Sequence, residues 1–192
     1  MADRKTELDA YTGGLFLMII FSAAWAILAT YFFNGLDFRI TGLVFGLVVL
    51  YLIIWYLRFV KSSKHLPTIS IETDGKKDKW FYIIFGLEGV AIFLAKNILL
   101  NIGVDYLFIT VMALIVGMHF LPLAKILNRK FLLIMGYWIS IIAGIGIVLI
   151  SSNQFGYKTI NAFVCMGCAL STTAYGLKIV NDGKSYLKKQ KS

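Results

Sequence analysis

Six long runs of apolar residues alternate with short polar stretches along the chain, and each run is long enough to cross a membrane as a helix. A helix needs about 20 mostly apolar residues to span a hydrocarbon core of about 30 Å. Strands of a membrane barrel would be about half as long and would alternate polar with apolar residues, which these runs do not. The predicted spans are Tyr11–Phe33, Ile40–Val60, Trp80–Ile102, Val104–Ile126, Phe131–Ser151 and Thr159–Val180. The pattern predicts an all-α polytopic membrane protein, a single bundle of six transmembrane helices over residues 1–192.

The connections between the predicted spans are short except for the polar stretch 61–79, which contains Pro67 and the turn signal Asp74-Gly75. Short connections make consecutive helices antiparallel neighbours. We therefore expect an up-and-down order of helices, with one longer loop after the second span.

Composition excludes several classes of protein. Of the 192 residues, 59% are hydrophobic and only 15% are charged, and the mean hydropathy is +0.78. A soluble domain has about 45–50% apolar and about 25% charged residues, so a soluble enzyme and a disordered chain are both excluded. The net charge of +9 does not indicate nucleic-acid binding, because the basic residues punctuate the apolar runs instead of forming one soluble face.

The distribution of Lys and Arg predicts the orientation of the bundle. Most of them fall on one side of the predicted membrane: Arg4, Lys5, Arg58, Lys61, Lys64, Lys76, Lys77, Lys79, Lys125, Arg129, Lys130, Lys178, Lys184, Lys188, Lys189 and Lys191. The opposite side has Arg39 and Lys158. Because cytoplasmic loops hold the excess of Lys and Arg, we expect both termini and the loop 61–79 to lie in the cytoplasm. We expect the membrane to be a bacterial plasma membrane. The same residues are expected to contact anionic lipid headgroups.

Small residues spaced four apart indicate where helices could pack closely. Such sets occur on four spans: Gly42 and Gly46; Ser22, Ala26 and Thr30; Gly136, Ser140 and Gly144; and Cys168, Thr172 and Gly176.

Three ionisable residues lie inside predicted spans: Glu88, Lys96 and His119. A charge at the centre of a bilayer costs about 2.5–3.5 kcal/mol on insertion scales, so such residues mark candidate functional sites. Glu88 lies about 12 Å along the third helix from its inner end, and His119 lies about 10.5 Å from the inner end of the fourth. In an antiparallel hairpin the two side chains are therefore at nearly the same height. We predict a Glu88–His119 pair that binds a proton, a cation or the polar group of a substrate. The alternative is that the pair only joins the two helices by an interhelical hydrogen bond.

Further polar residues are assigned to the same predicted site. Lys96 is expected to pair with Asp105 near the outer end, where Asn97 and Asn101 share a helix face. Pro122 is expected to kink the fourth helix and to free the carbonyl of Met118 as a ligand beside His119. From the sixth span, Thr172, Thr173 and Tyr175 could add hydrogen bonds. The predicted substrate- or ion-binding residues are Glu88, His119, Lys96, Asn97, Asn101, Asp105, Thr172 and Tyr175.

The leading functional hypothesis is a small-molecule or ion transporter, or the substrate-binding subunit of one. Size, helix number and topology resemble the small substrate-binding subunits of vitamin importers, and this resemblance in architecture implies a role in solute binding. A homodimer or partner membrane subunits are expected, because half of this chain is too small for a separate domain. No cofactor is expected, and a metal site is not predicted because one His and one Glu fall short of the usual ligand set for zinc.

Two alternatives remain open. The chain could be a membrane enzyme that uses Glu88 and His119 as acid and base, or Cys165 and Cys168 as a redox pair, since a CxxC motif lowers a thiol pKa. It could also be an accessory or immunity-type protein that binds another membrane protein through helix contacts. For Cys165-Met166-Gly167-Cys168, two buried small residues at a packing face is the favoured interpretation, because the chain has no second cysteine pair to pass electrons on.

Overall fold

The computed structural model is an all-α bundle and describes residues 4–5, 7–66, 69–70, 75–153 and 155–190. Its long helices are α1 (Glu7–Phe33), α2 (Ile40–Ser63), α3 (Gly75–Asn101), α4 (Phe108–Leu127), α5 (Lys130–Ser151) and α6 (Tyr157–Lys189). A 3₁₀ turn, η1 (Asp105–Leu107), precedes α4, and β1 (Arg4–Lys5) pairs antiparallel with β2 (Ile69–Ser70). All six helices are long and apolar enough to cross a membrane. The predicted fold class is confirmed.

Several helices extend past the predicted spans. On the Lys- and Arg-rich side, α2 continues to Ser63, α3 begins at Gly75, and α6 continues to Lys189. Hydropathy detects only the part of a helix that lies in lipid, whereas backbone hydrogen bonding continues into water. In the polar end of α6, Lys178 and Asp182 form an ion pair of 2.6 Å one turn apart, which favours helix. Pro67 and Asp74 lie outside the described residues.

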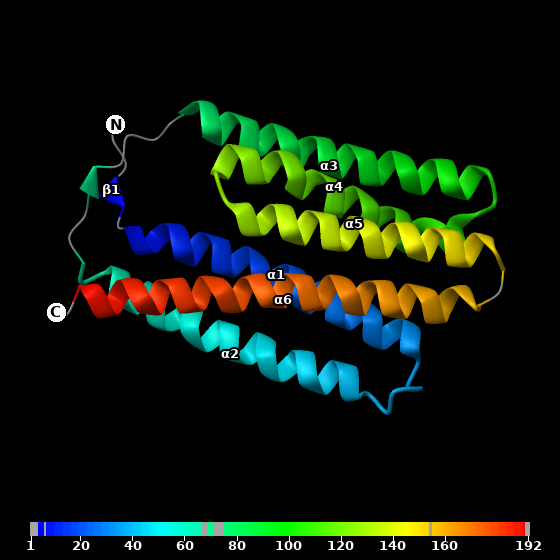
Figure 1. Cartoon of the computed structure of the whole chain (residues 1–192), viewed down its shortest axis with the longest axis horizontal. Helices are drawn as coiled ribbons and strands as arrows, with labels where there is room; N and C mark the ends of the chain where they lie inside the picture. The colour runs from blue at the N-terminus through cyan, green and yellow to red at the C-terminus, as the bar shows by residue number, and fades with distance from the viewer. Residues whose placement is uncertain (1–3, 6, 67–68, 71–74, 154, 191–192) are drawn as a thin grey trace.

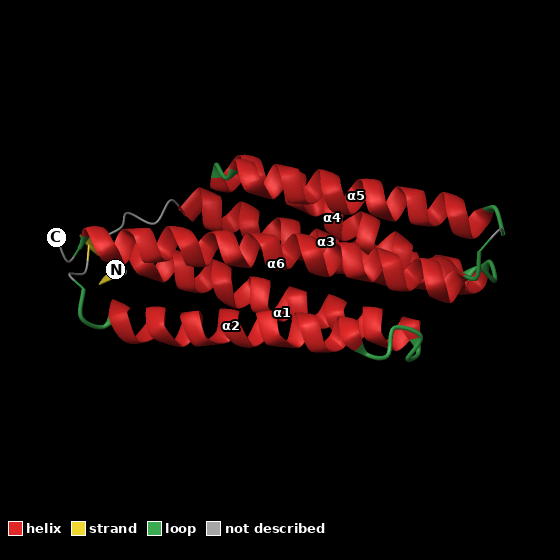
Figure 2. Cartoon of the chain, turned by 60° about the horizontal axis from the view of Figure 1, so that its bottom comes forward, coloured by secondary structure: helices red, strands yellow, loops and turns green. Residues whose placement is uncertain are grey.

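The helices form two groups of three (Figure 1). In one group α1 packs along α6 and α2; in the other α4 packs along α5 and α3. Contacts of α5 and α4 with α6 join the groups, and both views show α3, α4 and α5 together on one side of α1, α2 and α6 (Figure 2). The start of α1 and the end of α6 lie at the same end of the bundle, as an even number of spans requires.

Glycines allow the closest helix contacts. A Cβ atom on Gly117 of α4 would lie 2.7 Å from the backbone nitrogen of Ser140, and one on Gly136 of α5 would lie 2.9 Å from the carbonyl oxygen of Gly117. The two backbones therefore touch, as predicted for Gly136 and Ser140. For Gly144 and Gly46 the prediction of tight packing is wrong, because no atom lies within 4 Å of a Cβ built there.

Two other predicted small-residue faces do pack. Gly42 of α2 would place a Cβ 3.0 Å from the Thr30 hydroxyl of α1. On α6, Cys168 and Thr172 are fully buried, and a Cβ on Gly176 would lie 2.8 Å from the Leu52 side chain of α2.

Replacing Gly117 with Ala should destabilise the protein by about 1–3 kcal/mol, because the added methyl group would force α4 and α5 apart. Gly144→Ala is the matched control: it adds the same group to α5 where space is open, and it should be neutral or slightly stabilising. Thermal unfolding in detergent would compare the two. Equal melting temperatures for both variants would contradict the close contact of α4 with α5.

Candidate functional site

Glu88 of α3 and His119 of α4 meet in the structure. Glu88 Oε1 lies 3.3 Å from His119 Nδ1, and the two side chains are only 8% and 5% exposed. The sequence places both residues at one height, and the packing of α3 on α4 turns them toward each other.

Glu88 lies on the face of α3 that packs against α4. The helix α3 packs mainly along α4, through a stripe that contains the buried Ile84 and Glu88 and the half-buried Ile92, Ala95 and Leu99. These positions are spaced three to four residues apart, so they share one face. Glu88 is therefore the charged member of an otherwise apolar stripe.

The imidazole of His119 has one satisfied nitrogen and one unsatisfied nitrogen. Nδ1 lies 2.7 Å from the carbonyl oxygen of Val116, and since a carbonyl can only accept, Nδ1 carries a hydrogen. Nε2 is buried and has no hydrogen-bond partner among the described residues. The rings of Phe85 and Phe120 flank the imidazole, with centroids 5.3 and 4.2 Å away. A lone pair at Nε2 is thus held in an apolar surrounding, where it can accept a proton or a ligand hydrogen.

The pair has limited capacity for a metal ion. Glu88 and His119 offer two ligand side chains, and no cluster of three or more His, Cys, Asp or Glu side chains occurs in the described part of the chain. Four hollows in that part of the chain are lined by other residues, and one of them, of about 50 Å³, is bordered by Phe85 and Phe120, whose rings flank His119.

The polar residues near the outer end of α3 do not join the pair. Lys96, Asn97, Asn101 and Asp105 are all exposed, because they fall outside the stripe of α3 that packs on α4 or in the turn after it. Asn97 donates to the carbonyl of Phe93 on its own helix, at 2.8 Å. The expected Lys96–Asp105 ion pair does not form among the described residues.

The residues of α6 lie elsewhere in the bundle. Thr172 accepts a hydrogen bond of 3.1 Å from Ser22 of α1. The Tyr175 hydroxyl accepts one of 3.2 Å from Arg129 Nη1, and its ring stacks on Phe131. The helix α6 packs mainly along α1 and α5, and no hydrogen bond or ion pair joins Thr172 or Tyr175 to Glu88 or His119 in the described part of the chain.

Pro122 does not expose a ligand beside His119. The helix α4 is continuous through Pro122, from Phe108 to Leu127. Pro122 and Met118 are both exposed, on the face of α4 that turns away from its neighbours. The carbonyl of Met118, which Pro122 leaves without a hydrogen bond, belongs to this exposed face. It therefore does not lie beside the buried side chain of His119.

Cys165 and Cys168 are free thiols and fully buried in α6. Their burial agrees with the interpretation of the CxxC motif as two small packing residues.

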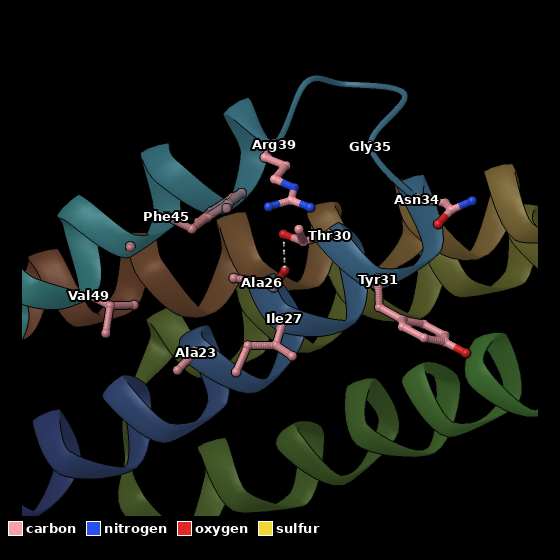
Figure 3. Close-up of a pocket in the computed structure, with 12 residues that line it drawn as sticks. Ala23, Ala26, Ile27, Thr30, Tyr31, Asn34, Gly35, Arg39, Phe45 and Val49 are labelled. Atoms are coloured by element: carbon pink, nitrogen blue, oxygen red, sulfur yellow. Dashed lines mark hydrogen bonds between the residues drawn. The ribbon is translucent and has the colours of Figure 1, made fainter.

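Sequence reasoning missed a groove of about 680 Å³ between the outer ends of α1 and α2 (Figure 3). Ala23, Ala26, Ile27, Phe45 and Val49 line its apolar part. Gly42 lies close to Thr30, whereas no atom lies within 4 Å of a Cβ built on Gly46, one turn further along α2 in the groove. Groove width depends on the angle between helices, and no local sequence pattern reports it.

The rim of this groove is polar. Arg39, Asn34 and Tyr31 lie there, and Figure 3 shows the Arg39 guanidinium extending toward Thr30. Asp37 shapes the turn below Arg39, since its carboxylate accepts from the backbone amides of Arg39 and Thr41, each at 3.0 Å. The Thr41 side chain and these amides hold the pKa of the Asp37 carboxyl below its ordinary value. The groove can therefore accept an apolar chain, with a guanidinium at its mouth for an anionic group.

Comparisons of this chain with protein-family models, with curated proteins and with solved structures find no match.

The contact between Glu88 and His119 predicts coupling in a double-mutant cycle. Glu88→Gln and His119→Asn should be non-additive by about 1 kcal/mol, above the average of about 0.6 kcal/mol for interhelical hydrogen bonds in membranes. Unfolding by a denaturing detergent, measured for the two single variants and the double variant, gives this number. Lys96→Gln combined with His119→Asn is the control and should be additive, because Lys96 points away from α4. Additive effects of the Glu88 and His119 variants would contradict the contact.

Proposed function

We propose that this integral membrane protein is a small transport protein, or the binding subunit of one, in which Glu88 and His119 take up the proton or cation that drives the transport step. The observation that supports this most directly is the buried contact of 3.3 Å between the two side chains, combined with the unpartnered Nε2 of His119. An ionisable pair inside a membrane marks a proton or ion pathway more often than a packing contact, because a packing contact gains little from charged groups.

The chemistry of the pair is a change of charge between two helices. With one proton shared between Glu88 and His119 the pair is neutral overall, either as carboxylic acid and imidazole or as carboxylate and imidazolium. Gain or loss of a proton leaves a net charge in an apolar surrounding, where it is strongly disfavoured. A cation bound at the carboxylate would balance the charge after a proton leaves. Proton and cation can therefore compete for the pair, which is the basis of coupled transport.

The packing of α3 allows a change of charge on the pair to move this helix relative to α4. Among the long helices α3 packs chiefly along α4, so separating the two disrupts fewer contacts than moving any helix of the other group. A charge on the pair favours admission of water or of a ligand between α3 and α4, and neutralisation favours closure. In this scheme the α3–α4 contact is the element with two states. We expect a homodimer or partner subunits to complete the pathway, since each group of three helices is small.

Electrical recording from proteoliposomes on a solid support tests the proposal. A step from about pH 8 to about pH 6, across physiological pH, should give a transient current as protons enter the buried pair. Alkali cations and small organic cations, applied at both pH values, should reveal the transported class. Glu88→Gln should abolish the current from the pH step and from any active solute.

Thr172→Val is the matched control, because it removes a buried interhelical hydrogen bond that involves no titratable group. Its currents should equal those of the wild type, even if its stability falls. Identical currents in wild-type and Glu88→Gln proteoliposomes, for the pH step and for every solute, would establish that Glu88 and His119 only hold α3 to α4.

A further inference from the structure

A second hollow, of about 470 Å³, lies between the inner ends of α2 and α6 and is lined by basic residues. Arg58 and Lys61 come from α2, and Lys184 and Lys188 come from α6, with Trp55 beneath them. None of its lining residues is acidic. Four cations that converge on one hollow repel one another, so an anion bound among them would be stabilised.

Trp55 holds two of these cations close together. Lys184 Nζ lies 4.0 Å from the centre of the indole ring, and Arg58 Cζ lies 4.8 Å from it. Lys184 also donates a hydrogen bond of 2.8 Å to the Tyr51 hydroxyl. These contacts fix the positions of two charges that would otherwise move freely on long side chains.

No carboxylate neutralises these two cations in the described part of the chain. The nearest acid in sequence, Asp182, is already paired with Lys178 on the same helix. Arg58 and Lys184 take part in no ion pair among the described residues. Their charge is therefore available to an external anion.

The height of the hollow is that of lipid headgroups. Arg58 lies about 27 Å along α2 from Ile40 at 1.5 Å per residue, close to the edge of a hydrocarbon core of about 30 Å. Below it on α2, the apolar side chains of Leu50, Ile54 and Leu57 are exposed on the outside of the bundle. A molecule that fits this surface has an anionic head at the level of Arg58 and alkyl chains along α2. A free phosphate would contact the basic residues but not the exposed apolar side chains of α2.

We propose that this hollow is a binding site for the phosphate headgroup of an anionic membrane lipid, taken from the leaflet on the Lys- and Arg-rich side. Arg58 and Lys184 contact the phosphate from the two helices, and Lys61 and Lys188 add charge at the rim. Trp55 positions the first two and lies at the interface where amphipathic rings are favoured. The bound lipid would bridge α2 and α6, which pack on each other less extensively than each packs on α1. This inference is independent of the role of Glu88 and His119.

Native mass spectrometry of the detergent-solubilised protein tests the proposal. The probe is an equal mixture of phosphatidylglycerol and phosphatidylcholine with the same acyl chains. The wild type should retain phosphatidylglycerol preferentially. The double variant Arg58→Gln with Lys184→Gln should lower the affinity for phosphatidylglycerol by roughly tenfold to thirtyfold, as expected for the loss of two cations at a membrane surface.

Two further variants separate a specific site from diffuse charge. Lys125→Gln with Lys130→Gln removes the same charge from the same side of the membrane, outside the hollow, and should leave the preference unchanged. Arg58→Lys with Lys184→Arg keeps both charges and should keep most of the binding, which also guards against a loss of folding in the Gln variant.

Three results would overturn the proposal. The first is equal retention of the two lipids by the wild type. The second is an equal loss in the Arg58–Lys184 and Lys125–Lys130 double variants, which would mean that net charge alone attracts the lipid. The third is protection against thermal unfolding by glycerol phosphate, at the same concentration, as large as that given by phosphatidylglycerol, which would assign the site to a soluble phosphate ester.

Discussion

Lipid offers no hydrogen-bond partners, and this constraint explains most of the structure. Backbone groups in a hydrocarbon core must be satisfied within their own segment, so each apolar run is a continuous helix. Polar side chains inside the bundle follow the same rule: Ser22 donates to Thr172, and the indole nitrogen of Trp138 donates to the carbonyl of Gly167 at 3.1 Å. Four buried side-chain atoms in the described part of the chain depart from this rule: His119 Nε2, Ser140 Oγ, Asn161 Oδ1 and Thr173 Oγ1. His119 attracts functional interest because, of these four residues, it is the one that titrates and that contacts a second ionisable side chain.

Close packing and polar chemistry are separated within the bundle. Close contacts occur inside the two groups of helices, as at Gly117 with Gly136 and at Gly176 with Leu52, and also between the groups, where a Cβ on Gly146 of α5 would lie 2.6 Å from the Val164 side chain of α6. The ionisable pair lies instead at the edge, between α4 and the peripheral α3. This arrangement suits a site that must change its charge. A movement of the peripheral α3 in response to that change need not disturb the close glycine contacts between the other helices.

Each end of α2 has a basic side chain next to exposed apolar surface. At the outer end, α2 and α1 border a groove of about 680 Å³ with Arg39 at its rim. At the inner end, α2 approaches α6, and Trp55 gathers Arg58 and Lys184. Both arrangements place a cation at the level of headgroups beside exposed apolar side chains, so contact with lipid is a consistent feature of this helix.

The sequence by itself determined the number of helices, their approximate membrane limits and the common height of Glu88 and His119. These properties depend on residues that are close along the chain, through hydropathy and the fixed rise of a helix. It could not determine which helices are neighbours or how each is rotated. The sequence pattern therefore groups Lys96, Thr172 and Tyr175 with Glu88 and His119, whereas in the structure Lys96 is exposed, Thr172 meets Ser22 of α1 and Tyr175 meets Arg129. Tyr51 and Lys184 show the same limit, because only the packing of α2 on α6 brings together two residues so far apart in the chain.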